Sequence, residues 1–138
     1  RIIDANLNRL REALRVIEEY YRFIDERPAV CVRLKRVRHS LVEVEAAVGK
    51  ERLLASRDTR TDCFAVKNRP EERERSGMSA LLAANFKRGQ EAARVLEEYA
   101  KIEGGALLCD KAKAARFALY TLEKELSGGK TEKRPRRG

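Results

Sequence analysis

A stretch of sixteen residues occurs twice in this chain, and the repeat constrains the fold more than any other feature. Residues 5–20 align with residues 84–99 at an offset of 79, and ten of the sixteen aligned positions are identical. Most of the identities are polar, whereas the apolar positions vary in size, as Leu10 and Gly89 do. An internal repeat of this kind predicts a fold made of two similar units.

Apolar residues recur at intervals of three and four, the spacing of amphipathic helices. The pattern predicts helices over residues 4–26, 28–49, 79–102 and 108–126, and a short helical turn at 51–55. Asp4 is the expected N-cap of the first helix, and Pro28 suits the first turn of the second. We therefore expect an all-α fold, a four-helix bundle made of two duplicated helical hairpins, residues 1–49 and 78–126, with a long central loop at 57–77.

The formal net charge is +9, and it is unevenly distributed. Residues 127–138 carry five basic residues and one acid, so we expect a basic flexible tail after a single domain of residues 1–126. Acids and bases alternate along the predicted helices, and the run at residues 69–75 suits a solvated helical turn. This alternation does not form a one-sided basic stripe, so nucleic acid is not an expected partner.

The cysteines Cys31, Cys63 and Cys109 are far apart in the sequence and form no C-x-x-C pair. Such a set is typical of free thiols in a reducing, cytoplasmic compartment. The sequence contains no run of about 20 apolar residues, so no membrane span is expected.

Two asparagines and two arginines of the repeat are candidates for a binding site. On a helical wheel, Asn6 and Arg9 flank the apolar seam, and Asn85 and Arg88 occupy the same places in the second copy. One interpretation is structural, because an Asn beside a seam fixes helix register and neighbouring Arg and Glu residues form weak ion pairs. The other is that the four side chains converge near the pseudo-two-fold axis and hold an anion, since guanidinium groups match phosphate oxygens.

The first half of the central loop contains the best metal candidates. Asp58 and Asp62, with Thr59 between them, suit Mg²⁺, which takes few carboxylates together with waters and substrate phosphates. The competing interpretation is that these carboxylates close Asx-turns, which are common in loops. His39 is the single histidine, and its place beside the second seam favours a structural role. Gly-rich phosphate-binding motifs are absent from the sequence.

Two N-x-x-R-x-x-E-A-x-R-V-x-E-E-Y blocks flank an R-D-T element, with LKRVRHSL between the first block and that element. In this order the motifs resemble the ThiD2-type hydroxymethylpyrimidine phosphate kinase family, a helical domain found alone or fused ahead of thiamine-phosphate synthase. The resemblance extends over nearly the whole chain. It implies an ATP-dependent kinase of thiamine biosynthesis that converts 4-amino-5-hydroxymethyl-2-methylpyrimidine phosphate to the diphosphate.

The resemblance also implies site residues, cofactors and partners. ATP would be the co-substrate, and Asp58 and Asp62 would hold Mg²⁺, with Asp58 as the catalytic acceptor of the hydroxymethyl proton. A thiamine-phosphate synthase and a second copy of the chain are further expected partners. The substrate and its phosphates would be bound by polar and basic side chains of the repeat and the loop: Asn6, Arg9, Arg57, Thr59, Asn85 and Arg88. Tyr20 or Tyr99 would stack on the ring, if either is not simply part of the core.

A second hypothesis needs no catalysis. The chain would then be a helical dimerisation or regulatory module associated with thiamine-phosphate synthase, and the repeat would serve packing alone. A dry seam between the repeats favours the module, whereas a polar cleft at the pseudo-two-fold axis, covered by residues 57–62, favours the kinase.

Overall fold

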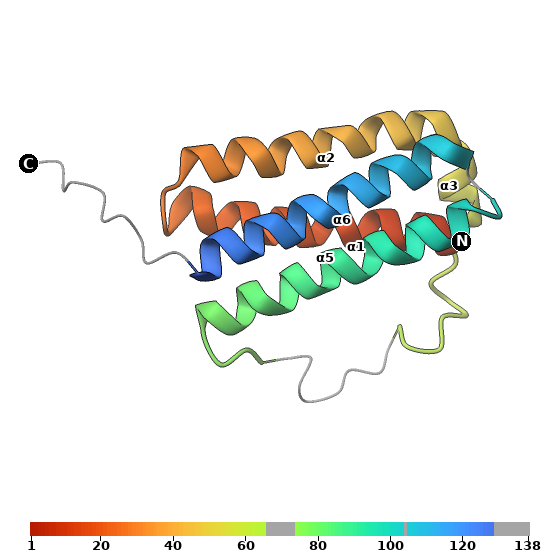
Figure 1. Ribbon diagram of the computed structural model, residues 1–138. Helices are drawn as coiled ribbons and strands as arrows, with labels where there is room; N and C mark the ends of the chain where they lie inside the picture. Colours follow the sequence, from red (N-terminus) through yellow and green to blue (C-terminus); the bar gives the residue numbers. More distant parts are fainter. Residues whose placement is uncertain (66–73, 104, 129–138) are drawn as a thin grey trace, which may run out of the picture.

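The computed structural model describes residues 1–65, 74–103 and 105–128, and all regular structure in these ranges is helical. No strand occurs in them, so the expected all-α class is confirmed. Figure 1 shows the arrangement of the five described helices: α1 (Ile2–Phe23), α2 (Pro28–Val48), α3 (Lys50–Ser56), α5 (Met78–Ala100) and α6 (Gly105–Gly128).

Helix α1 shows why the repeat folds as it does. Leu7, Leu10, Leu14, Ile17 and Tyr21 form the apolar stripe, and all of them are buried, which is how an amphipathic helix contributes to a core. The helix begins at Ile2, two residues before the predicted start, and Arg1 is its N-cap. The prediction that Asp4 caps α1 is therefore wrong, and this carboxylate lies inside the first turn instead.

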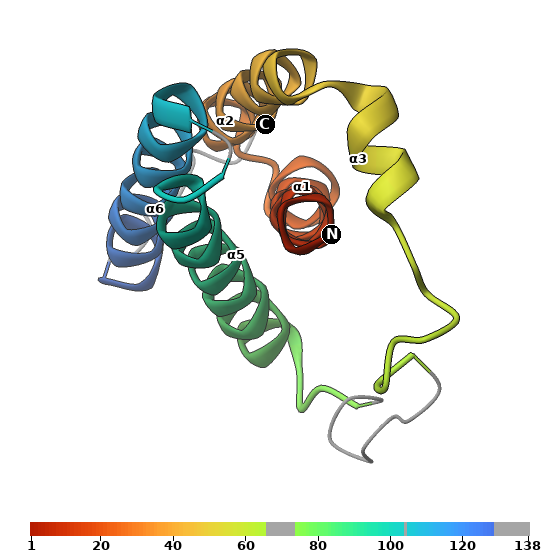
Figure 2. The same ribbon diagram turned by 90° about the vertical axis from the view of Figure 1, so that its right-hand side faces the viewer.

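The four long helices run antiparallel to their neighbours. Helix α1 packs against α2 and α5, and α6 packs against α5 and α2, so the four helices enclose one apolar core. The end-on view in Figure 2 shows α5 and α6 tilted relative to α1. Gly89 on α5 lies between α6 and α1, because a Cβ atom on it would be 2.8 Å from Leu119 Cδ1 on α6 and 3.5 Å from Ala13 Cβ on α1.

Short connections join the members of each helix pair. Between α1 and α2 the chain turns at Glu26, whose φ of +48° is in the left-handed region. Between α5 and α6 the corresponding position by the repeat offset is Gly105, whose φ is +80°. Helix α3 follows Gly49, which reaches a φ of +102° that L-residues rarely adopt.

Helix α3 covers one end of the molecule and leads into the central loop. Residues 57–65 are described, are not helical and are all exposed. Most of the charge run at 69–75 and most of the predicted basic tail at 127–138 lie outside the described residues. Helix α6 continues two residues beyond the predicted domain boundary at Leu126.

Candidate functional site

In each helix pair, one ion pair with a buried glutamate connects the two helices. Glu18 on α1 accepts hydrogen bonds from Arg38 on α2, at 3.1 Å from Nε and 3.3 Å from Nη2. Glu97 on α5 accepts the same two bonds from Arg116 on α6, at 2.5 and 3.0 Å. Both glutamates are buried, and hydrogen bonding to Glu97 raises the pKa of Arg116. Two of the repeated glutamates are thus committed to contacts between helices.

Two partly buried cysteines, one in each helix pair, also make equivalent contacts. The Cys31 thiol donates to the Glu18 carbonyl oxygen at 3.9 Å, and the Cys109 thiol donates to the Glu97 carbonyl oxygen at 3.7 Å. Burial is the main cause that raises the pKa of Cys31. A raised pKa disfavours the thiolate, the form that would act as nucleophile or metal ligand, so Cys31 suits packing.

The two asparagines of the repeat also make equivalent bonds. Asn6 donates from Nδ2 to the Ile2 carbonyl oxygen, and Asn85 donates to the Leu81 carbonyl oxygen, both at 2.9 Å. Each amide therefore bonds to its own helix one turn earlier. Asn6 is buried, so one of the predicted substrate-binding amides lies at the edge of the core.

The arginines that accompany these asparagines are exposed. Arg9 approaches Asn6 Oδ1 at 3.5 Å, which is a weak contact. Arg88 makes no hydrogen bond or ion pair with any residue that the structure describes. These guanidinium groups remain available to solvent, and their predicted role in phosphate binding stays a prediction.

The two polar clusters do not meet at the pseudo-two-fold axis. Gly89 lies against Leu10 and Ala13, so this small and apolar contact marks the centre of the α1–α5 seam. Asn6 and Asn85 extend from that centre in opposite directions because the helices are antiparallel. At 1.5 Å per residue they are separated by roughly 15 Å along the helix axes. At its centre the α1–α5 seam is therefore an apolar contact, and the four predicted Asn and Arg side chains do not form one shared cleft there.

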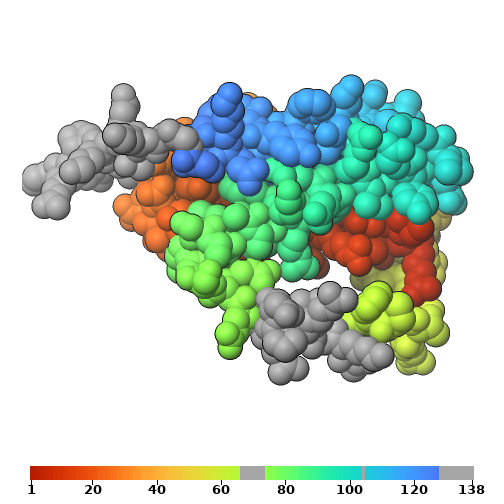
Figure 3. Space-filling model, turned by 60° about the horizontal axis from the view of Figure 1, so that its bottom comes forward, coloured from red at the N-terminus to blue at the C-terminus, as the bar shows by residue number. Residues whose placement is uncertain are grey.

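The start of the central loop is held against α1. Arg57 donates from Nε and Nη2 to the two carboxylate oxygens of Asp4, each at 2.9 Å, and this bonding raises the pKa of Arg57. Asp4 is buried and also accepts a long hydrogen bond of 3.4 Å from Asn8. The predicted phosphate-binding group of Arg57 is therefore engaged with a carboxylate. Figure 3 shows the N-terminal part of α1 between the end of α5 and the yellow-green residues of α3 and the loop.

The two candidate metal ligands close local turns. Asp58 Oδ1 accepts the backbone N–H groups of Arg60 and Thr61, each at 3.1 Å, and Oδ2 accepts the Thr61 hydroxyl. The bonds from Thr61 are the main cause that lowers the pKa of Asp58. Asp62 Oδ1 accepts the N–H of Phe64 at 3.0 Å. Both carboxylates thus have the geometry of Asx-turns.

Nothing in the described part of the chain gathers three or more His, Cys, Asp or Glu side chains into a group that could hold a metal ion. Thr59, which lies between the two aspartates in the sequence, is exposed. The roles of Asp58 and Asp62 toward Mg²⁺, and of Asp58 in catalysis, stay predictions.

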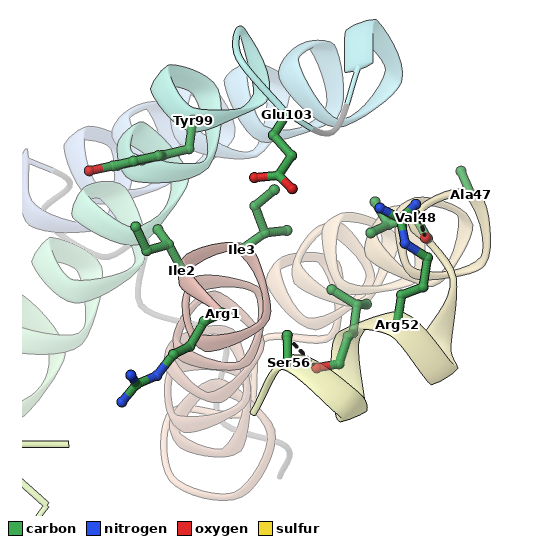
Figure 4. A pocket seen from close by; sticks show the side chains of 10 residues that line it. Arg1, Ile2, Ile3, Ala47, Val48, Arg52, Ser56, Tyr99 and Glu103 are labelled. Carbon is green, nitrogen blue, oxygen red and sulfur yellow. Dashed lines mark hydrogen bonds between the residues drawn. The ribbon is translucent and has the colours of Figure 1, made fainter. Parts of the chain in front are cut away.

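A cavity of about 460 Å³ lies at the end of the molecule that α3 covers (Figure 4). Its walls come from the first turn of α1, the end of α2, α3 and the end of α5. They combine apolar side chains with two arginines, one tyrosine and one acid: Arg1, Ile2, Ile3, Ala47, Val48, Arg52, Leu53, Ser56, Tyr99 and Glu103. Tyr99 is the one predicted ring-binding residue among them, and the metal and phosphate candidates lie outside the cavity. Sequence reasoning missed Arg52 and Glu103, because charge on a short helix or a helix end carries no signal of its own.

This chain is similar to a known protein family and to several longer proteins. The model of the ThiD2 family matches residues 1–125, so the chain belongs to the ThiD2 family. It is 44% identical over 127 residues to a thiamine-phosphate synthase of Thermosynechococcus vestitus, a match that covers 92% of this chain and 35% of the relative. Thiamine-phosphate synthases of Nostoc punctiforme and of a Synechocystis species are each 41% identical, over 93% and 97% of this chain and 35% and 38% of the relatives. The chain thus spans about a third of the length of these relatives, and no solved structure matches it.

These comparisons confirm the family resemblance and correct the function inferred from it. All three relatives carry the name of a synthase, and none of the three is named a kinase. The expectation of an ATP-dependent pyrimidine phosphate kinase is therefore wrong, and the hypothesis of a helical module associated with thiamine-phosphate synthase fits better. None of the described helices is long and apolar enough to cross a membrane.

Proposed function

We propose that this chain is a non-catalytic helical module of thiamine biosynthesis that dimerises or regulates a thiamine-phosphate synthase. The observation that carries the proposal is the match itself. About nine-tenths of this chain aligns with about a third of proteins named thiamine-phosphate synthase. A module of such a protein, fused to its synthase part or bound to it, accounts for that proportion.

The contacts of the repeated polar residues support a structural role. Glu18 and Glu97 are occupied by Arg38 and Arg116, and Asp4 is occupied by Arg57. Salt bridges of this kind fix how helices pack. Side chains that are engaged in them are not free to bind a substrate or to transfer a proton. The α1–α5 seam supports the same role, because the α1 residues that face Gly89, Leu10 and Ala13, are apolar.

We further infer that the four long helices form a four-helix bundle produced by duplication of one helical hairpin. The cross-helix contacts support this origin, because they recur at the repeat offset. Arg11 bonds to Glu45 in the first half, and Gln90 bonds to Glu123 at 3.0 Å in the second. Position 11 corresponds to 90, and 45 to 123, with offsets of 79 and 78 as for the buried Glu–Arg pairs.

The test uses the Thermosynechococcus relative, whose matched stretch is removed genetically. We expect the shortened protein to form thiamine phosphate more slowly or to lose its assembly state, and this 138-residue chain to restore the lost property when added separately. Enzyme turnover and sedimentation velocity measure the two properties. The matched control is the chain carrying Arg116→Met, which is expected to unfold more readily and restore less.

The proposal fails if the shortened relative keeps the turnover and mass per protomer of an intact synthase and does not respond to the added chain. It also fails if the chain alone turns over a phosphorylated substrate, because a module of this kind carries no reaction of its own.

A further inference from the structure

We propose that the outer face of α6 is the surface through which two copies of this chain bind each other, with their α6 helices antiparallel. This inference rests on the proposed function and names the surface by which the module would bring two synthases together. It comes from an aromatic pair and two flanking charges on the side of α6 that is turned away from the core.

Phe117 lies at the middle of the outer face of α6. At about 100° per residue, it is on the opposite side of the helix from the direction that the buried side chains share. Figure 2 shows α6 at the edge of the bundle, with no described element beyond its outer side. Phe117 is 52% exposed and Tyr120 is 45% exposed, whereas polar residues usually occupy this part of an amphipathic helix. The buried side chains of α6 are Leu108, Ala112, Ala115, Leu119 and Leu122.

Contacts on the helix itself position the aromatic pair. The Phe117 and Tyr120 rings meet edge to face, with their centroids 6.4 Å apart and their planes at 74°. The Arg116 guanidinium lies 4.9 Å from the Phe117 centroid and 5.8 Å from the Tyr120 centroid. Arg116 is itself held by Glu97, which accepts a hydrogen bond from Nη2 at 3.0 Å. The rings are therefore ordered before anything binds, and ordered aromatic side chains lose little conformational entropy in an interface.

The other three long helices have no aromatic pair at this place. By the offset of 78 residues, the pair corresponds to His39 and Val42 on α2. Opposite the buried stripes of α1 and α5 lie the exposed carboxylates of Glu12 and Glu91. An exposed aromatic cluster that only one of four similar helices carries indicates a binding surface on that helix.

Two charged side chains flank the aromatic pair on the same face. Asp110 precedes Phe117 by seven residues and Lys124 follows it by seven, so they lie about 10 Å from it along the helix axis, in opposite directions. Both are exposed, and neither forms an ion pair with a residue that the structure describes. The corresponding positions of α2 are Val32 and Ala46, which carry no charge.

The order of these groups identifies the occupant as a second copy of the chain. When two α6 helices pack antiparallel about Phe117, the Asp110 of each copy lies near the Lys124 of the other. Opposite charges placed in this way favour the contact and fix its register. A parallel arrangement would bring Asp110 to Asp110 and Lys124 to Lys124, and these like charges disfavour it. The face is therefore complementary to itself, as a two-fold interface requires.

The sizes of the side chains support the same arrangement. The Phe117 ring of each copy lies near Ala114 of the other, so a large side chain meets a small one. Lys113 is the remaining charged residue of the outer face, and it lies opposite Thr121, which is uncharged. Burying exposed aromatic rings is favourable, and aromatic residues are enriched in interfaces.

Sedimentation equilibrium of the 138-residue chain tests the pairing. Between about 1 and 100 µM, a range typical of modest affinities, we expect the mass to rise from that of one 15.8 kDa chain to that of two. Phe117→Ser is expected to weaken the dimer by about tenfold or more and to leave the circular dichroism unchanged, because the ring is exposed. The matched control is His39→Ser at the corresponding exposed position of α2, and it is expected to leave the dimer intact.

Charge reversal tests the antiparallel order. Asp110→Lys alone and Lys124→Asp alone each replace both attractive contacts by repulsive ones, so each variant is expected to dimerise about tenfold more weakly. An equimolar mixture of the two variants restores both contacts, and it is expected to dimerise about as well as the unchanged chain. Damage to folding would not be repaired by mixing.

Four results would overturn the inference. One is a chain that stays a monomer over the whole concentration range. Another is a dimer that Phe117→Ser leaves intact, because the contact would then lie on a different surface. The third is a pair of charge variants that each dimerise as well as the unchanged chain, because the helices would then not be antiparallel. The fourth is a mixture that dimerises no better than its members.

The two proposals fail separately. The proposed function survives each of these four results if removal of the matched stretch still impairs the relative. Conversely, a shortened relative with unimpaired turnover and assembly removes the proposed function, while the dimer of the free chain is measured without any synthase.

Discussion

The two helix pairs of this protein share their polar contacts but differ in their packing and closure. Both have a buried Glu–Arg pair between their helices and a thiol that bonds to the same glutamate's carbonyl oxygen. Only the first pair is followed by a described short helix, α3, and by a carboxylate–guanidinium contact that fastens the next segment to α1. Only the second pair has a glycine at the centre of the seam, where the first has Leu10.

This difference shows which parts of the repeat define the fold and which parts distinguish its halves. The shared contacts connect helices within a pair, so they set the geometry of each unit. The unshared features lie at the seam, where the two units meet each other, and at the ends of the helix pairs. Substitutions that give one helix pair a residue of the other therefore test whether the shared contacts set the fold and the unshared residues set the difference between the pairs.

The largest effect is expected where a buried charge loses its partner. Arg116→Met removes the one ion-pair partner of Glu97 among the described residues and keeps an apolar stem of similar length. It is expected to cost about 3 kcal/mol of unfolding free energy, as when one member of a buried pair is removed. Arg38→Met is expected to cost less, because Glu18 retains Arg15 at 3.9 Å. Urea unfolding monitored by circular dichroism measures both values.

The control for this prediction removes the charge as well as its partner. In the double variant Glu97→Leu with Arg116→Met, no uncompensated carboxylate remains, and most of the lost stability is expected to return. Equal costs for Arg116→Met and Arg38→Met would show that Arg15 does not compensate Glu18 and that the two pairs are energetically the same.

An intermediate effect is expected at the seam. Gly89→Leu gives α5 the residue that α1 has at the corresponding position, but a Cβ atom there would already be 2.8 Å from Leu119 Cδ1 and 3.5 Å from Ala13 Cβ. Overpacking of this kind costs about 1–3 kcal/mol, partly offset by the better helix propensity of Leu. Thermal unfolding of the variant measures the loss.

A double-mutant cycle tests whether the seam is the cause. Leu10 faces Gly89 and is fully buried, so Leu10→Ala makes room for a leucine at position 89. The two changes are expected to be less harmful together than the sum of their separate effects, by about 1 kcal/mol. Simple additivity would mean that the strain lies against Leu119 and not in the α1–α5 contact.

The sequence predicted the helices better than the site, for a physical reason. Apolar spacing reports which face of a helix is buried, and Leu14 and Leu96, in the two seams, are fully buried as expected. The partner of a polar side chain depends on the register between helices, which the pattern does not report. Asp4 illustrates the problem, because its place near a helix start suggested a cap whereas its partner is Arg57, 53 residues away. The Asx-turn geometry of Asp58 was one of two alternatives that spacing alone left open.

The smallest effect is expected at the turns that close the two pairs. Glu26 has a φ of +48°, and the corresponding Gly105 has a φ of +80°, so a left-handed residue occurs in both connections although only one of them is glycine. Glu26→Gly relieves the steric cost of a side chain in this conformation, and the gain is expected to be up to about 1 kcal/mol after the greater freedom of glycine in the unfolded chain is subtracted. Gly105→Ala is the matched reverse change, since a Cβ atom there meets nothing within 4 Å and the expected loss is conformational alone.

The midpoint of urea unfolding measures both variants. Opposite shifts with unchanged slopes would show that both turns carry the same backbone strain. A loss of stability in both variants would show that the Glu26 side chain contributes a contact that its turn needs.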